Sequence, residues 1–183
     1  LAYESVQVNE RILMIWDGRV ALPIHRYQGT VGEHAWSRDG QLAFTEFDML
    51  SGGKDEIFIW DGDTTTNLSQ NASGSDRFPA WGVDGKLAFQ SERNGGYDIL
   101  VWDGYSRDNG VPDIDTFVNI APEMTGYLSI PVWTNTGSIT FSGTSPVDHQ
   151  AQIYQWDGQT ATNMSQNPSF HNGGQSWSND GYW

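Results

Sequence analysis

Residues 79–104 read PAWGVDGKLAFQSERNGGYDILVWDG, and this stretch decides the fold. Its apolar opening "PAW" leads into Asp-Gly, a strong signal for a tight hairpin turn. "KLAFQS" then alternates apolar and polar residues, and "DILVW" is a β-branched and aromatic run that ends at a second Asp-Gly. The stretch therefore predicts three short antiparallel strands.

The same phrases recur along the chain. W-D-G stands at 16–18, 60–62, 102–104 and 156–158, and AWSRDGQLAF at 35–44 returns in related form at 80–89 and 132–141. A third phrase, TNLSQN at 66–71, returns as TNMSQN at 162–167 and as VNIAPE at 118–123. From the Asn of this phrase to the next Trp is 14 residues in each copy: Asn67 to Trp81, Asn119 to Trp133 and Asn163 to Trp177. Fixed separations indicate one repeated structural unit.

The third phrase adds a fourth strand to each unit, and no stretch shows a sustained helical period. Four antiparallel strands in roughly 46 residues are typical of a β-propeller blade. The sequence of residues 79–104 also closely resembles the TolB-type repeat, called WD40-like or PD40. The resemblance extends over essentially the whole chain. In that family, the Pro-x-Trp-Ser-x-Asp-Gly phrase supplies the innermost strand and its turn. The resemblance implies a secreted, periplasmic or cell-envelope location.

We expect a single all-β domain over 1–183, with units at 177–183 plus 1–32, 33–78, 79–130 and 131–176. Each blade would hold four antiparallel strands. The chain opens inside a strand pattern and stops after an inner-strand phrase. Because open strand edges invite pairing, the favoured arrangement is a four-bladed ring closed by the C-terminal strand joining the N-terminal blade. The alternative is half of an eight-bladed ring formed by a homodimer.

Charge and composition exclude several partners. The net charge is −14, and residues 108–183 hold seven acids but no Lys or Arg. Such a surface repels nucleic acid, and no apolar run is long enough to insert into a membrane. The chain has no Cys, which excludes disulfides and thiolate chemistry. Protein, peptide or glycan partners remain.

Strand alternation divides the connections between two faces. Tight Asp-Gly turns share one face, where Asp17, Asp61, Asp103 and Asp157 are expected to cap their own turns. The other face carries loops that differ in length and content, at 5–11, 45–56, 90–98 and 142–152. Variable loops on a rigid frame usually carry binding. The candidate ligand-binding residues on this face are His34, Asp76, Arg77 and Asn172 at the inner-strand entrances, followed by Arg93, Asp55 and His149 from the loops.

Other residue types have less specific readings. The Trp of each W-D-G phrase (Trp16, Trp60, Trp102 and Trp156) is expected to pack between blades. The inserted loop at 105–117 offers Asp108, Asn109, Asp113 and Asp115 as oxygen ligands for Ca²⁺, although their spacing does not match an EF-hand. His25, His34, His149 and His171 lack the short spacing of a metal site. No cofactor and no metal is expected otherwise.

The sequence holds no nucleophile elbow and no phosphate-binding loop. It therefore predicts a non-enzymatic propeller that presents its variable loops to a protein, peptide or glycan. Two alternatives remain open. One is a metal-dependent lyase or hydrolase that uses the histidines, and the other is a gating propeller excised from a larger peptidase.

Overall fold

The computed structural model describes residues 1–7, 10–49, 52–71, 73–93, 95–104, 116–124, 126–145, 147, 149–167, 169 and 171–178. These residues form strands and no α-helix. The strands are β1 (Ala2–Gln7), β2 (Glu10–Trp16), β3 (Ala21–Tyr27), β4 (Thr30–Trp36), β5 (Leu42–Asp48), β6 (Lys54–Trp60), β7 (Thr65–Asn67), β8 (Asp76–Trp81), β9 (Leu87–Arg93), β10 (Gly96–Trp102), β11 (Val118–Asn119), β12 (Val132–Trp133), β13 (Ile139–Thr144), β14 (Ala151–Trp156) and β15 (Ala161–Asn163).

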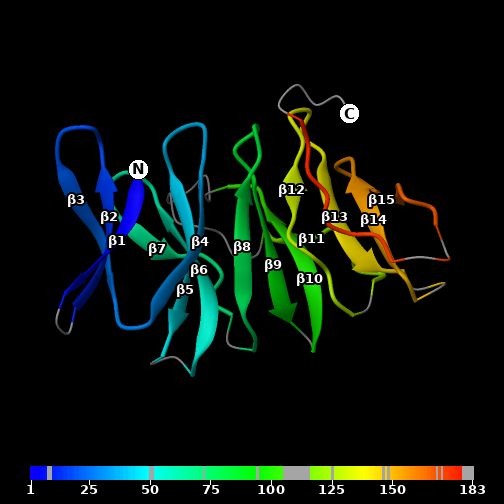
Figure 1. The fold of residues 1–183 in the computed structure, drawn as a ribbon, viewed down its shortest axis with the longest axis horizontal. Helices are drawn as coiled ribbons and strands as arrows, with labels where there is room; N and C mark the ends of the chain where they lie inside the picture. The colour runs from blue at the N-terminus through cyan, green and yellow to red at the C-terminus, as the bar shows by residue number, and fades with distance from the viewer. Residues whose placement is uncertain are drawn as a thin grey trace.

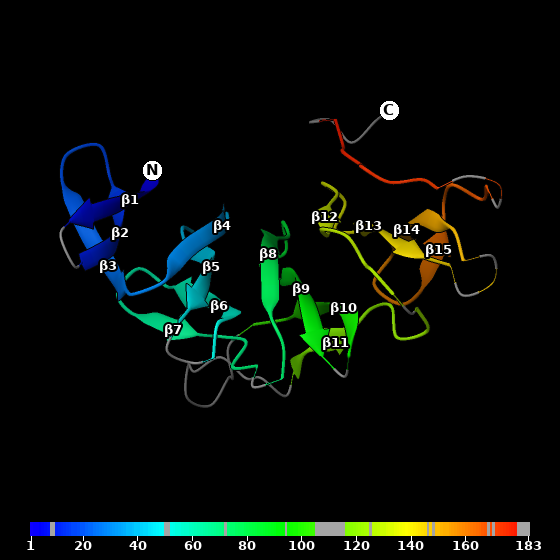
Figure 2. The ribbon, with the colours of Figure 1, turned by 60° about the horizontal axis from the view of Figure 1, so that its bottom comes forward.

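The strands form four antiparallel sheets in chain order, which confirms the predicted all-β blades. Blade 1 is β1-β2-β3, blade 2 is β4-β5-β6-β7, blade 3 is β8-β9-β10-β11 and blade 4 is β12-β13-β14-β15. The blades stand side by side (Figure 1) and follow an arc whose inner side carries β4, β8 and β12 (Figure 2). In each blade, therefore, the chain passes from the inner side of the arc to the outer side.

Tight turns repeat with the same hydrogen bonds on one face, here called the turn face. The inner-strand turns are closed by backbone bonds from Ser37 to Gln41 (2.8 Å), from Gly82 to Lys86 (2.8 Å) and from Thr134 to Ser138 (2.8 Å). Glycines in these turns, such as Gly85 with φ +82°, adopt the left-handed conformation that residues with a side chain rarely adopt. The opposite ends of the strands carry the variable loops and form the loop face.

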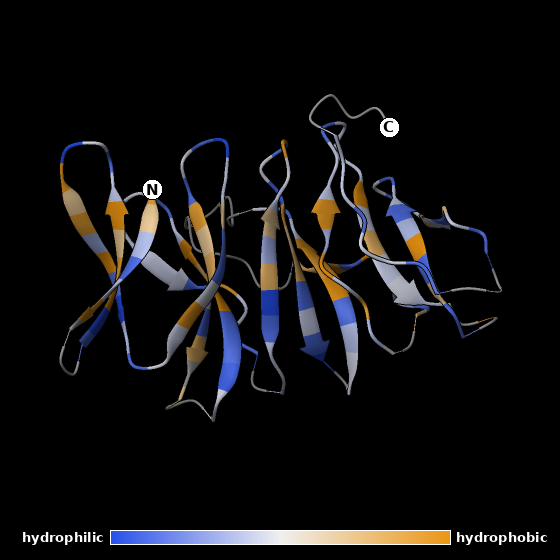
Figure 3. Ribbon diagram, in the orientation of Figure 1, coloured by the Kyte–Doolittle hydropathy of each residue, from blue (hydrophilic) through white to orange (hydrophobic). Residues whose placement is uncertain are grey.

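The hydrophobic core lies between adjacent blades. Phe44 of blade 2 packs with residues of blade 1, Phe89 of blade 3 packs against blade 2, and Phe141 of blade 4 packs against blade 3. All three rings are fully buried. Figure 3 shows the complementary pattern, because β6, β8 and β9 are hydrophilic where they reach the loop face. The apolar parts of the strands thus pack between the blades, and polar side chains gather toward the loop face.

The Trp of the W-D-G phrases is buried in blades 3 and 4 but not in blade 1. Trp102 and Trp156 are buried, whereas Trp16 is 42% exposed. In blades 2 and 3, the inner-strand Trp meets the W-D-G Trp edge to face, at 6.3 Å between Trp36 and Trp60 and at 6.2 Å in the equivalent pair of blade 3. Trp16 lacks this partner because blade 1 has no inner strand among the described residues.

The segment 171–178 lies against blade 4 and not beside β1. Gln175 donates its side-chain N–H to the Ile130 carbonyl (3.1 Å), and Trp177 donates its indole N–H to Thr140 Oγ1 (2.9 Å). Figure 2 shows this segment on the inner side of blade 4. It occupies the place of an inner strand that follows blade 4. Closure of the ring stays a prediction, since residues 179–183 lie outside the described residues.

Candidate functional site

A polar lock fastens the outer edge of blade 2 at the loop face. Ser69 donates its hydroxyl to Glu56 Oε2 (2.6 Å), and the backbone N–H of Asn71 donates to the same oxygen (3.0 Å). The backbone N–H of Ile57 in turn donates to Ser69 Oγ (2.9 Å). Glu56, Ser69 and Asn71 are all buried. The lock therefore ties the chain leaving β7 to the third strand of its own blade.

Blade 4 repeats this lock with an amide in place of the acid. Ser165 donates its hydroxyl to Gln152 Oε1 (2.6 Å), and the backbone N–H of Asn167 donates to the same oxygen (3.2 Å). The backbone N–H of Ile153 donates to Ser165 Oγ (3.1 Å). Gln152 stands four residues before its W-D-G Trp, as Glu56 does in blade 2. The hydrogen-bond pattern thus belongs to the repeat and does not depend on charge.

Blade 3 carries no such lock. Asp98 holds the position of Glu56 and Gln152, but Ala121 replaces the Ser and Glu123 replaces the Asn. Ala121 has no hydroxyl to donate, and Glu123 is exposed. Asp98 instead accepts one hydrogen bond on Oδ1, from Asn119 Nδ2 at 2.9 Å. The polar side chain that blades 2 and 4 seal is therefore left half-buried in blade 3.

A cavity of about 400 Å³, here called the outer cavity, opens at this unlocked position. One wall is the β9–β10 hairpin, and the other is the connection from β11 toward blade 4. The cavity is lined by Arg93, Gly95, Gly96, Tyr97, Asp98, Asn119, Pro122, Met124 and Gly126. These residues belong to the loop face, so the cavity lies where the variable loops predict binding.

A second cavity of about 220 Å³, the inner cavity, lies between the inner strand of blade 4 and the segment after β15. It is lined by Tyr127, Ser129, Ile130, Val132, Gly174 and Gln175. Tyr127 of this cavity and Tyr97 of the outer cavity meet edge to face, with 5.3 Å between ring centroids. This ring contact links the linings of the two cavities, which together are taken as the candidate site.

Four of the predicted ligand-binding residues come together, but at the neighbouring seam between blades 2 and 3. Arg77 donates its Nε–H to Asp55 Oδ2 (2.6 Å). Arg93 donates to the Ser69 carbonyl (3.1 Å), and its Nη2 lies 3.6 Å from Asp76 Oδ2. These side chains bind one another and the backbone, so this cluster joins the two blades. Arg93 alone among them also lines the outer cavity.

The seam cluster contains two buried acids whose ionisation is disfavoured. Burial raises the pKa of Asp76, and hydrogen bonds and the charge of Arg93 oppose that shift. Burial also raises the pKa of Glu56; donors from Ser69 and Asn71 lower it, and the charge of Asp76 raises it further. Both carboxyl groups are therefore harder to ionise than in water.

The remaining predicted residues lie apart. His34 is exposed on β4, and His149 is exposed with φ +57° in the β13–β14 loop. Asn172 is half-buried and donates to Gln152 Oε1 (3.4 Å), so it belongs to the blade 4 lock. The calcium candidates Asp108, Asn109, Asp113 and Asp115 lie outside the described residues. Among those that are described, no three His, Asp or Glu side chains are grouped to hold a metal ion.

The carboxylates of three W-D-G turns accept two backbone N–H groups each. Asp17 accepts from Arg19 (2.7 Å) and Val20 (2.8 Å), and Asp61 and Asp157 repeat the arrangement. These hydrogen bonds lower the pKa of all three carboxyl groups. For Asp103, the structure describes the residue but not the loop that follows Gly104.

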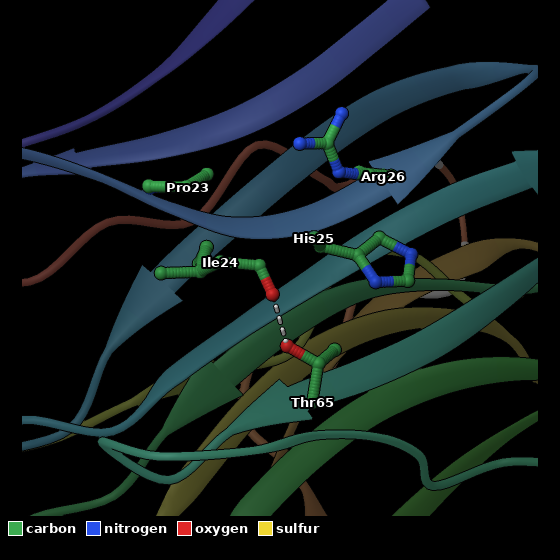
Figure 4. Close-up of a pocket in the computed structure, with 5 residues that line it drawn as sticks. All are labelled: Pro23, Ile24, His25, Arg26 and Thr65. Atoms are coloured by element: carbon green, nitrogen blue, oxygen red, sulfur yellow. Dashed lines mark hydrogen bonds between the residues drawn. The ribbon is translucent and has the colours of Figure 1, made fainter.

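A third cavity, of about 390 Å³, lies between the outer strands of blades 1 and 2. It is lined by Pro23, Ile24, His25 and Arg26 of β3 and by Thr65 of β7, and Figure 4 shows the Ile24 carbonyl directed at the Thr65 hydroxyl. The Thr65 hydroxyl donates to the Ile24 carbonyl (2.9 Å), and His25 Nε2 lies 2.6 Å from Oε2 of the buried Glu46. These two contacts join the blades, and they already use the polar groups that a ligand would need.

The residues of the candidate site, apart from Arg93, were not predicted from the sequence. Tyr97 and Asp98 lie in the variable loop at 90–98, where binding was predicted but these two residues were not singled out, and Asn119 and Tyr127 lie outside the predicted loops. One signal was present in the repeat itself, because VNIAPE departs from TNLSQN at its Ser and its second Asn. The meaning of that departure depends on knowing that these two residues seal an acid or amide four positions before the W-D-G Trp.

No protein-family model and no curated protein sequence matches the chain. Solved structures do match its fold. TolB from Acinetobacter baumannii has 17% identity and a TM-score of 0.61, and the match covers 90% of this chain and 40% of TolB. A puromycin hydrolase mutant complexed with PGG has 16% identity and a TM-score of 0.60, with 95% and 28% covered.

The β-propeller domain of the Trilobed protease from Pyrococcus furiosus also matches, with 15% identity and a TM-score of 0.51; 89% of this chain and 57% of that one are covered. At these identities the likeness shows the fold alone, which is a TolB-like β-propeller. This chain spans between about a quarter and three fifths of each of the three neighbours. None of the described residues forms a helix that is long and apolar enough to cross a membrane.

Proposed function

We propose that this TolB-like β-propeller is a non-catalytic binding module that takes an extended ligand across blades 3 and 4 of its loop face. The observation that carries the proposal is the missing lock of blade 3. At one position of the repeat, two blades seal their polar side chain with a Ser hydroxyl and an Asn backbone amide. Blade 3 leaves the equivalent side chain, Asp98, open to a cavity of about 400 Å³.

Rigidity supports the same proposal. The tyrosine pair and the Asp98–Asn119 contact are held on paired strands and on a connection fixed by backbone bonds, such as Met124 N–H to the Ala121 carbonyl (3.1 Å). A site of this kind loses little conformational entropy when a ligand binds. Two cavities of about 400 and 220 Å³, whose linings are linked by the tyrosine pair, also suit a chain-like ligand.

The test uses a variant that restores the lock. Asp98→Glu, Ala121→Ser and Glu123→Asn together copy the pattern of blade 2 into blade 3. Glycan and peptide arrays are probed with the labelled wild-type chain and with this relocked variant. We expect immobilised ligands that retain the wild type and release the relocked variant, at equal thermal stability. Binding of both proteins to the same spots, or of neither to any spot, would overturn the proposal.

A second candidate is the propeller of a larger peptidase. Two matching structures favour it, namely a puromycin hydrolase and the propeller domain of a protease. The full coding region that surrounds this sequence distinguishes the candidates. A hydrolase domain with a nucleophile elbow would support the peptidase role, and its absence would leave the binding module.

A further inference from the structure

We propose that the outer cavity binds a neutral sugar residue of an oligosaccharide, with Asp98 and Asn119 as its polar contacts. This inference rests on the proposed function and names the ligand class of that site. Its basis is an acceptor, a donor and balanced charge around the outer cavity, together with the exposed ring of Tyr127, which lines the inner cavity and contacts Tyr97 of the outer one.

The polar pair is matched to hydroxyl groups. Asp98 uses Oδ1 to accept from Asn119 Nδ2, so within the described part of the chain its Oδ2 has a lone pair to offer. Asn119 has a second N–H on the same nitrogen, because a primary amide carries two donors. An acceptor and a donor joined at 2.9 Å suit a group that both donates and accepts, and a hydroxyl does both.

Charge argues against anionic ligands. Among the residues that line the outer cavity, Arg93 and Asp98 are the charged ones, and their signs are opposite. The guanidinium of Arg93 is also committed to the Ser69 carbonyl (3.1 Å) and lies 5.3 Å from the Phe117 ring centroid. The chain as a whole carries −14 and repels anions. A neutral ligand meets none of these penalties.

The tyrosine pair supplies the apolar surface that a sugar ring requires. Tyr127 is 55% exposed, and its orientation is held by the edge-to-face contact with Tyr97. The face of an aromatic ring carries negative potential, which attracts the polarised C–H groups on one side of a pyranose. Gly95, Gly96 and Gly126 leave parts of the outer cavity's walls without side chains, which gives a pyranose ring room to approach.

The experiment is isothermal titration of the full chain with neutral hexasaccharides of glucose, xylose, mannose and N-acetylglucosamine, and with an acidic galacturonate oligomer. We expect at least one neutral sugar to bind and the acidic oligomer to bind more weakly. Asp98→Ala should weaken the binding by about tenfold or more, because it removes a hydrogen bond to a charged group. Tyr127→Ala should weaken it by about two- to tenfold.

Two further variants keep the result interpretable. The relocked variant Asp98→Glu, Ala121→Ser and Glu123→Asn should fold and lose the sugar, whereas Gln159→Ala, on the exposed turn face, should bind like the wild type. If no neutral hexasaccharide binds, or if binding ignores Asp98, the sugar assignment is wrong. If the wild type then binds peptides on the arrays and the relocked variant does not, the proposed function stands without the sugar assignment. If nothing on the arrays binds, both the proposed function and the sugar assignment are wrong.

Discussion

Leu1 and Trp16 exchange two backbone hydrogen bonds, from Leu1 N to the Trp16 carbonyl (3.0 Å) and from Trp16 N to the Leu1 carbonyl (2.7 Å). The same pairing joins Leu42 to Trp60 and Leu87 to Trp102. Leu1 therefore stands in register with Leu42 and Leu87, the first residues of β5 and β9. In blades 2 and 3, this leucine also pairs with the inner-strand Trp.

This equivalence predicts the register that a closed ring would have. Trp177 should pair with Leu1, and Ser176 with Ala2, as Trp36 pairs with Leu42 and Ala35 with Ala43. Directly opposite residues in an antiparallel pair are about 4.5–5.5 Å apart between Cα atoms, which suits a disulfide. We expect the variant Ala2→Cys, Ser176→Cys to form one under mild oxidation, and the cysteine-free background makes the product unambiguous.

Mass analysis under non-reducing conditions reads out the result. A cross-linked single chain supports the four-bladed ring, and a cross-linked pair of chains supports the eight-bladed homodimer. Ala2→Cys with Gln175→Cys is the control, since a shift of one residue turns the side chain to the other face. Failure of the first pair to cross-link faster than the control would contradict closure at this edge.

The two buried acids at the seam of blades 2 and 3 predict a pH-dependent stability. Glu56→Gln with Asp76→Asn copies the amides of blade 4, where Gln152 and Asn172 stand at the same positions. Burial raises the pKa of both acids in the folded state, so the folded protein holds its protons more tightly and loses stability as pH rises through this range.

The free energy of unfolding of the double variant should therefore exceed that of the wild type increasingly as the pH rises above about 4, where the two acids ionise in the unfolded chain. Urea unfolding at several pH values measures the difference in the free energy of unfolding. Arg93 keeps its contacts with the Ser69 carbonyl and Phe117, which limits the cost of losing the Asp76 charge. If the variant instead becomes less stable than the wild type as the pH rises, the ion pair of Asp76 with Arg93 contributes more to stability than burial of the acids costs.

Gly74 lies in a place that admits no side chain. A Cβ atom there would stand 1.8 Å from the backbone oxygen of Glu92, so the backbone would have to move. We expect Gly74→Ala to destabilise the fold by about 1–3 kcal/mol. Gly96→Ala is the matched control, because nothing lies within 4 Å of its Cβ position, and it should change stability by about 0.5 kcal/mol or less. Equal unfolding midpoints for the two variants would contradict the close approach.

The His25–Glu46 contact should couple blade 1 to blade 2. His25 lies among Phe44 and Phe58, at 5.4 and 5.0 Å between ring centroids, and its Nε2 is 2.6 Å from the Glu46 carboxylate. A double-mutant cycle with His25→Phe and Glu46→Gln should give a coupling of about 1–3 kcal/mol, because a phenyl ring keeps the packing and loses the hydrogen bond. If the stability changes of the two single variants simply add, packing alone joins blades 1 and 2 at this contact.

The sequence predicted the blades because each one is encoded by local signals. Asp-Gly turns, alternating strands and the fixed spacing from Asn67 to Trp81 all act within one unit. It also placed Asp55, Asp76, Arg77 and Arg93 on one face, and the structure brings them together. Their mutual ion pairs were not predictable, since they depend on how one blade packs against the next.

The candidate site escaped prediction for a related reason. Asp98 resembles any acid in a strand until its equivalents Glu56 and Gln152 are seen to be sealed. The tyrosine pair joins residues 97 and 127 across a connection whose path is set by packing between blades. A pattern of residues can show that a repeat has changed, but only the three-dimensional contacts show what the change opens.

Because the same hydrogen-bonded lock can be present or absent in a blade, the number of binding positions on one chain can be changed by substitution. In blades 2 and 4, a Ser hydroxyl and a backbone N–H seal the central polar group, whereas blade 3 has Ala121 in place of the Ser and leaves Asp98 half-buried. Converting Glu56, Ser69 and Asn71 to the Asp, Ala and Glu of blade 3 would expose a second carboxyl group on the same face. The number of ligands held by one chain would then follow from a handful of substitutions, with no new loop required.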